Sequence, residues 1–129
     1  MKKIYLIIVL LFSVSINSQN LIGAWERVQE NDSGILEKQI VIFTTQGYQS
    51  ISIFNAKTGE FIYTNGGTWE LNGENLTEKV EFDTANPERV GSETTFKIII
   101  NEKSINVPIM GRTWTRLDNG SPGKLEGAW

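Results

Sequence analysis

Apolar and polar residues alternate over short stretches of this chain, and turn residues separate the stretches about every ten positions. The clearest alternation covers residues 76–82, where Leu76, Glu78, Val80 and Phe82 share one face. A period of two is typical of a strand with one buried face. No long stretch shows the 3.6-residue period of an amphipathic helix. The pattern therefore predicts an all-β chain.

Turn signals set the limits of the predicted strands. Asn72–Gly73 is the strongest short hairpin signal, and Gly66–Gly67 is expected to break or bulge the sheet. A helical turn is expected after Pro87, and Pro108 should weaken the strand that contains it. The expected strands cover residues 21–30, 35–45, 48–54, 60–64, 68–71, 76–82, 95–100, 103–110 and 111–117.

Sequential strands joined by tight turns favour an up-and-down meander. Closing such a meander removes the unpaired edges that promote aggregation. The sequence therefore predicts a small antiparallel β-barrel of about eight to ten strands over residues 19–117. A barrel of this size has an interior that either is filled by side chains or holds one small ligand.

The amino-terminal residues have the pattern of an export signal. Lys2 and Lys3 precede an apolar run, Ile4–Ile16, which ends in small and polar residues. An uncleaved anchor is the alternative, but the run is shorter than the roughly 20 residues of a spanning helix. We expect a signal peptide over residues 1–18, cleavage before Gln19, and a mature chain that is exported without membrane insertion. Its destination would be the periplasm, the cell surface or the medium.

The motif LIGAW at residues 21–25 returns as LEGAW at residues 125–129. Between them, residues 117–124 are rich in Gly, Ser, Pro and Asn, as in flexible linkers. We expect residues 118–129 to be a linker and the start of a truncated second copy. A second tandem domain is therefore a possible partner.

The composition excludes or disfavours several kinds of partner and active site. The net charge is −3 and would become more negative after loss of the signal peptide, so a nucleic-acid partner is disfavoured. The chain has no cysteine, which excludes disulfides and thiol nucleophiles. It also has no histidine, the commonest metal ligand and general base. We expect no metal and no cofactor.

Gly23 and Trp25 on the first strand, taken with Arg116 on the last, resemble the lipocalin signature. The segments GGTWELNGENLTEKVEF, NPERVG and RTWTRLD are similar to bacterial lipocalin-like domains of unknown function, and the resemblance covers residues 21–117. It implies a barrel in which Gly23, Trp25 and Arg116 close one end, with the guanidinium stacked on the indole. Haem-binding relatives rely on a histidine, which this chain lacks.

Glu78 is the first candidate site residue, because alternation points it into the barrel. A buried carboxylate requires a partner or a raised pKa. One interpretation is a structural ion pair with Arg112 or Arg116. The other makes Glu78 and Arg112 the polar anchor of an apolar pocket.

Aromatic and aliphatic residues of the strands would form the walls of that pocket, although such residues are more often plain core. The candidate ligand contacts are Glu78, Arg112, Trp114, Tyr63, Trp69, Phe82, Phe96 and Ile98.

Three functions remain open. The preferred one is an exported binding protein that holds a small hydrophobic or amphipathic molecule, since no catalytic set of residues is evident. The second is an interaction domain of a larger envelope or secreted protein, with a filled interior. The third is an enzyme on a lipid-like substrate, with Glu78 as acid or base and Tyr63 as donor, which requires a cavity beside Glu78.

Overall fold

The fold is taken from a computed structural model that describes residues 21–119. The predicted signal peptide (residues 1–18) and the LEGAW repeat (residues 125–129) lie outside the described residues, as do residues 120–124 of the predicted linker. The export, cleavage and tandem-domain predictions therefore stay predictions.

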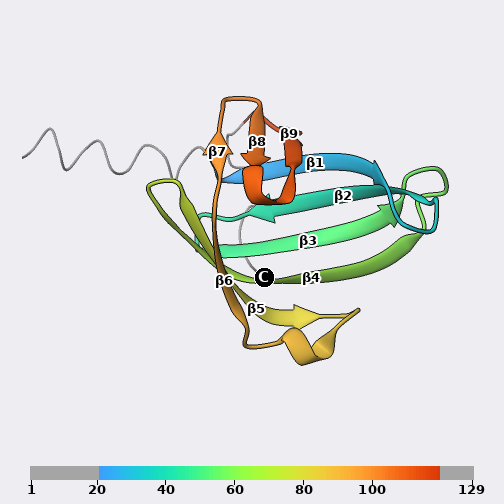
Figure 1. The fold of residues 1–129 in the computed structure, drawn as a ribbon, viewed down its shortest axis with the longest axis horizontal. Helices are drawn as coiled ribbons and strands as arrows, with labels where there is room; N and C mark the ends of the chain where they lie inside the picture. Colours follow the sequence, from blue (N-terminus) through green and yellow to red (C-terminus); the bar gives the residue numbers. More distant parts are fainter. Residues whose placement is uncertain (1–20, 120–129) are drawn as a thin grey trace, which may run out of the picture.

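The described residues form one antiparallel sheet in the order β6-β5-β4-β3-β2-β1-β9-β8-β7, which curls into a nearly closed barrel (Figure 1). Neighbours in the sheet are neighbours in sequence, except where β1 pairs with β9. The predicted up-and-down barrel is confirmed. The strands are β1 (Gly23–Glu30), β2 (Leu36–Phe43), β3 (Tyr48–Asn55), β4 (Phe61–Asn72), β5 (Asn75–Asp83), β6 (Glu93–Lys97), β7 (Ile99–Ile100), β8 (Ser104–Val107) and β9 (Arg112–Arg116).

The two edges of the sheet are joined by the chain itself. β6 pairs with β5, and β7 pairs with β8. Ile98 lies between β6 and β7, is 1% exposed, and donates its backbone N–H to the carbonyl of Glu74 at 2.8 Å. The predicted single strand at 95–100 is therefore two strands, because the chain changes partners at Ile98 as it crosses from one edge to the other (Figure 1).

A β-bulge changes the direction of the end of β5. Gly67 lies opposite Val80 and Gly66 opposite Phe82, so Glu81 is an extra residue in the ladder. After the bulge Asp83 is buried, whereas Phe82 is 42% exposed. The prediction that Phe82 faces the interior is wrong, because the extra residue reverses the alternation. β4 itself runs through the Gly pair without a break.

Two short 3-10 helices begin at prolines. The predicted turn after Pro87 is confirmed as η1 (Pro87–Arg89). The predicted strand at 103–110 is too long, because β8 ends at Val107 and Pro108 begins η2 (Pro108–Met110). Proline lacks the N–H that a central strand needs, and its fixed φ suits the first turn of a helix.

The hydrophobic core surrounds Trp25, which is fully buried. Along β1 and β2 the inward residues change from apolar to polar. Near Gly23 they are Trp25, Val41 and Phe43, whereas near the turn at residues 31–34 they are Gln29, Glu37 and Gln39. One end of the barrel is thus packed with apolar side chains and the other with polar ones.

Candidate functional site

A cavity of about 300 Å³ lies inside the barrel, between the apolar and the polar ends. Its apolar wall consists of Leu21, Val41, Phe43, Ile51, Leu76, Phe96, Ile98, Ile105, Val107, Met110 and Trp114. Its polar wall consists of Gln29, Glu37, Gln39, Gln49, Tyr63, Asn65, Glu78, Arg89 and Arg112. The interior is therefore not filled, and it offers both kinds of surface to one occupant.

The apolar end is closed by Trp25 and Arg116, where the sequence placed the closure. The guanidinium of Arg116 lies 4.0 Å from the centroid of the Trp25 ring, and the indole N–H donates to the Leu21 carbonyl at 2.9 Å. Arg116 also donates to the carbonyls of Ile22 at 3.2 Å and Glu102 at 3.0 Å. One side chain thus ties β1, β9 and the turn after β7 together.

Gly23 leaves the space that this closure needs. A Cβ at Gly23 would lie 2.7 Å from a carboxylate oxygen of Asp118 and 2.8 Å from a guanidinium nitrogen of Arg116. Arg116 and Asp118 form an ion pair at 3.1 Å, and Asp118 accepts the N–H of Ala24 at 2.9 Å. The glycine also has φ +134°, which other residues rarely adopt. The three closure residues therefore act as one unit.

The side chain of Glu78 lines the cavity and forms no hydrogen bond or ion pair with any of residues 21–119. The expected ion pair with Arg112 or Arg116 is not formed: Arg116 is held at the closed end by Asp118 and backbone carbonyls, and the guanidinium of Arg112 donates to the sulfur of Met110. Burial raises the pKa of Glu78 to about 7, and the positive charge of Arg89 only partly opposes this rise. Near neutral pH the carboxyl is thus divided between its protonated and ionised forms.

Arg89 reaches the cavity from η1 and was not among the sequence candidates. It forms an ion pair of 2.9 Å with Asp83, whose side chain is 1% exposed. Asp83 also accepts the backbone N–H groups of Ala85 at 3.0 Å and Asn86 at 2.8 Å. Asp83 is therefore satisfied and holds Arg89 beside Glu78. The bulge that buries Asp83 could not be located from alternation.

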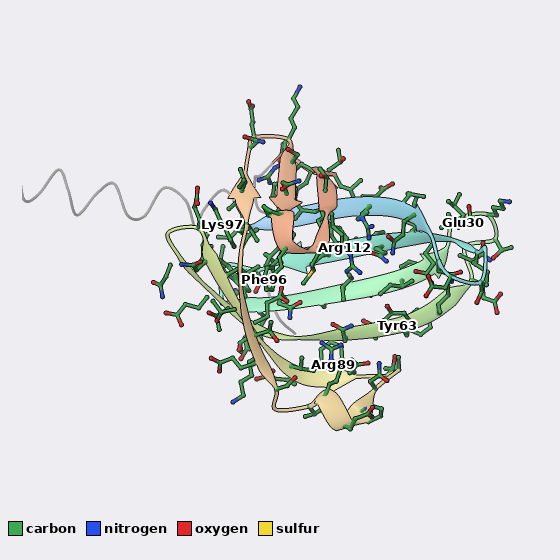
Figure 2. All side chains as sticks on the ribbon, viewed as in Figure 1. Glu30, Tyr63, Arg89, Phe96, Lys97 and Arg112 are labelled. Atoms are coloured by element: carbon green, nitrogen blue, oxygen red, sulfur yellow. The ribbon has the colours of Figure 1, made fainter. Side chains whose placement is uncertain are left out.

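Arg112 lines the cavity from β9, on the opposite side from Arg89 (Figure 2). Arg27 lies near it on β1 and donates to the side-chain oxygens of Gln39 at 3.3 Å and of Gln29. Burial lowers the pKa of Arg27, and the positive charge of Arg112 lowers it further. Sequence reasoning missed Arg27, although its place two residues after the inward Trp25 is a signal that it faces the interior.

Of the aromatic and aliphatic candidates, the structure places Tyr63, Trp114, Phe96 and Ile98 on the cavity wall. Burial raises the pKa of the Tyr63 hydroxyl, and the negative charge of Glu37 adds to the rise. Glu37 accepts a hydrogen bond from Asn31 at 2.8 Å. The phenol therefore stays protonated and can donate a hydrogen bond into the cavity.

Trp69 does not line the cavity, contrary to prediction. Its ring meets Phe43 edge-on, with centroids 5.7 Å apart and planes at 88°, so it contributes to the core beyond the cavity. The indole nitrogen is buried and has no hydrogen-bond partner within residues 21–119. Phe82, the other candidate outside the cavity, lies over Gly66, with its Cζ 2.8 Å from where a Cβ would be.

The interior amides were also missed from the sequence. Gln39 and Gln49 are 5% and 7% exposed and line the cavity.

Within residues 21–119 no group of three acidic side chains is placed to hold a metal ion. No helix in that part of the chain is long and apolar enough to span a membrane.

Comparison with protein-family models gave no match, and neither did comparison with curated proteins. Among solved structures, the chain is similar to a lipocalin-like protein from Bacteroides uniformis. The similarity has a TM-score of 0.49 and 22% identity, and it covers 75% of this chain and 96% of the other.

Proposed function

We propose that the protein binds one small amphipathic molecule inside its barrel. The observation that supports this proposal most is the cavity of about 300 Å³, with an apolar wall on one side and polar side chains on the other. Ligand sites in proteins are concave, mostly apolar and equipped with a few polar groups that fix orientation. The volume is at the lower end of their usual range, which favours a small ligand.

The polar groups of the cavity support a ligand with a polar head. Glu78 has no partner within the described chain, and Arg112 forms no ion pair there. Both side chains are partly withdrawn from solvent, where a hydrogen bond or an ion pair to a polar group is favourable, so a ligand that bonds to them gains affinity. The apolar wall, which includes Phe96 and Trp114, would hold the rest of the molecule.

Native mass spectrometry of the full chain, purified from a bacterial lysate, tests this proposal. We expect a second mass species that carries a retained small molecule, and we expect Glu78→Gln to reduce its share. Glu81→Gln, an exposed neighbour on β5, is the matched control and should retain the molecule. A ligand-free mass, with no uptake from a mixed pool of lipids and metabolites, would count against a binding function.

A second candidate is an enzyme in which Glu78 transfers protons. An acid or base catalyst of this kind needs access to the cavity and a pKa near the working pH. The carboxyl of Glu78 lies on the cavity wall and has a pKa of about 7. Incubating the protein with the retained molecule and analysing the products by mass spectrometry tests it. Conversion that Glu78→Gln abolishes would support an enzyme, whereas unchanged recovery of the molecule would support binding alone.

The amino-terminal pattern supports the further proposal that the binding protein is exported. Its Lys2–Lys3 pair and the apolar run Ile4–Ile16 match the charged and apolar regions of export signals. Fractionation of cells that express the full chain, followed by amino-terminal sequencing, tests this. Recovery outside the cytoplasm with a new terminus at Gln19 is expected.

A further inference from the structure

The first and last strands of the barrel pair over a short distance only. β1 and β9 are in register at Trp25 with Arg116 and at Glu26 with Thr115, and no further pairs follow. Continued register would bring Arg27 and Gln29 opposite Trp114 and Arg112. We call this unpaired stretch the seam. A surface groove of about 520 Å³ lies over it, lined by Glu26, Arg27, Val28, Thr113, Thr115 and Leu117.

Two arginines near the seam, Arg27 and Arg112, form no ion pair with a carboxylate of residues 21–119. The chain has four arginines. Arg89 and Arg116 form ion pairs with aspartates, whereas Arg27 and Arg112 form none within residues 21–119. Arg27 is held by neutral glutamine oxygens, and the guanidinium of Arg112 donates to the sulfur of Met110 at 4.0 Å.

The two guanidinium groups are close enough to affect each other. The charge of Arg112 disfavours the charged form of Arg27, in addition to the effect of burial. Like charges held together at a half-buried site are unfavourable unless a counter-ion neutralises them.

None of the nearby acids forms an ion pair with Arg27 or Arg112 within residues 21–119, and Glu26, which lines the groove, pairs with Lys38 at 3.9 Å. Glu37 accepts a hydrogen bond from Asn31 and forms no ion pair within residues 21–119. Glu78 is largely desolvated, and Arg89 is the positive charge that affects its pKa. Tyr63 is a neutral donor on the same cavity. Arg27 and Arg112 therefore have no direct carboxylate partner within residues 21–119, and Arg112 lies beside the apolar wall, where Trp114 follows it by two residues on the same strand.

We propose that the seam binds the acidic head group of the ligand, a carboxylate or similar oxyanion, between Arg112 and Arg27, with the apolar part of the ligand in the cavity. This inference rests on the proposed function. Guanidinium groups present paired N–H donors that match the oxygens of such anions. An anion held by both side chains would also join β1 to β9 where the backbone does not.

Titration calorimetry with decanoate and with decanol tests the proposal, since the two molecules share one chain and differ in the head. We expect decanoate to bind about tenfold tighter or more, because charged hydrogen bonds stabilise more than neutral ones. Arg112→Gln should reduce decanoate affinity to that of decanol and leave decanol affinity unchanged. Lys97→Gln is the control, since Lys97 is an exposed cation paired with Glu74, and it should keep the preference.

Equal affinities of the wild-type protein for the two molecules would overturn the head-group site and leave the binding function intact. Absence of binding by both would overturn the two proposals together. If inorganic phosphate displaced decanoate completely at equal concentration, the seam would be a site for free anions and the head-group proposal would be wrong. Should Arg112→Gln not fold, Arg27→Gln provides the same comparison from the other strand.

Discussion

At the scale of single residues, the carboxyl of Glu78 is the most informative group. Alternation on β5 was sufficient to predict that it faces inward, because the bulge comes only after Val80. Its lack of an ionic partner was not predictable, because ion pairs depend on where side chains from distant strands end. The result is a carboxylic acid with a pKa near 7 on the wall of a cavity.

Replacing Glu78 by Gln should change how stability depends on pH. The pKa of Glu78 is raised to about 7 in the folded state from 4.5 in the reference state, so the folded protein binds the proton more tightly. The contribution of Glu78 to the free energy of unfolding should thus fall as pH rises from 4.5 to 7 and stay level above that range. Glu78→Gln removes the loss, on the order of 3 kcal/mol at neutral pH.

Urea unfolding between pH 4 and about 8, followed by tryptophan fluorescence, measures this difference. Glu81→Gln, on the exposed side of the same strand, should give a curve parallel to that of the wild-type protein. A constant offset between wild type and Glu78→Gln at all pH values would contradict the raised pKa.

At the scale of elements, the β4–β5 hairpin shows what a sequence pattern can and cannot predict. The Gly66–Gly67 pair correctly signalled an irregularity in the sheet. It did not show which strand carries the extra residue, and the bulge in β5 turned Phe82 outward and Asp83 inward. The alternation pattern does not reveal the extra residue of a bulge. Inward and outward positions predicted beyond the bulge are therefore exchanged.

Close backbone contact at the bulge explains why Gly67 is a glycine. A Cβ there would lie 1.9 Å from the carbonyl oxygen of Lys79 and 2.8 Å from the nitrogen of Glu81. We expect Gly67→Ala to lower the free energy of unfolding by about 3 kcal/mol or more, because backbone atoms must move.

The control for Gly67 is Gly73→Ala in the Asn72–Gly73 turn. Gly73 has φ +61° and no atom within 4 Å of its Cβ position, so only the backbone strain of about 1–2 kcal/mol applies. Chemical denaturation compares the two variants. A cost for Gly67→Ala no greater than that for Gly73→Ala would argue against the close packing at the bulge.

At the scale of the whole molecule, closure of the barrel depends on Arg116. The resemblance of the Gly-x-Trp motif and the late arginine to the lipocalin signature implied this contact between Arg116 and Trp25, and the structure contains it. The polar half of the cavity was not predicted. Glutamines are usually exposed, so nothing in the sequence indicated that Gln39 and Gln49 are buried. Their burial depends on the curvature of the closed sheet rather than on local pattern.

Arg116→Ala and Arg112→Ala, on the same face of β9, should differ sharply in stability. Arg116→Ala removes the stacking on Trp25, two hydrogen bonds to carbonyls and the ion pair with Asp118, for a loss of about 2–4 kcal/mol. Arg112→Ala removes a cation that lies near Arg27, so the ligand-free protein should lose less than about 0.5 kcal/mol. Equal losses in urea unfolding would contradict the division of β9 into closing and binding residues.

A titration with the fluorescent probe 1-aminoanthracene tests most directly whether the barrel interior holds a ligand. Val41→Trp and Ile42→Trp place the same ring on adjacent residues of β2, one in the cavity wall and one on the exposed face. We predict saturable binding to the wild-type protein and to Ile42→Trp, and none to Val41→Trp with its strand content intact by circular dichroism. Ile51→Trp, an inward change on β3, replaces Val41→Trp if that variant does not fold. No saturable binding to the wild-type protein, or equal binding to all folded variants, would contradict the account.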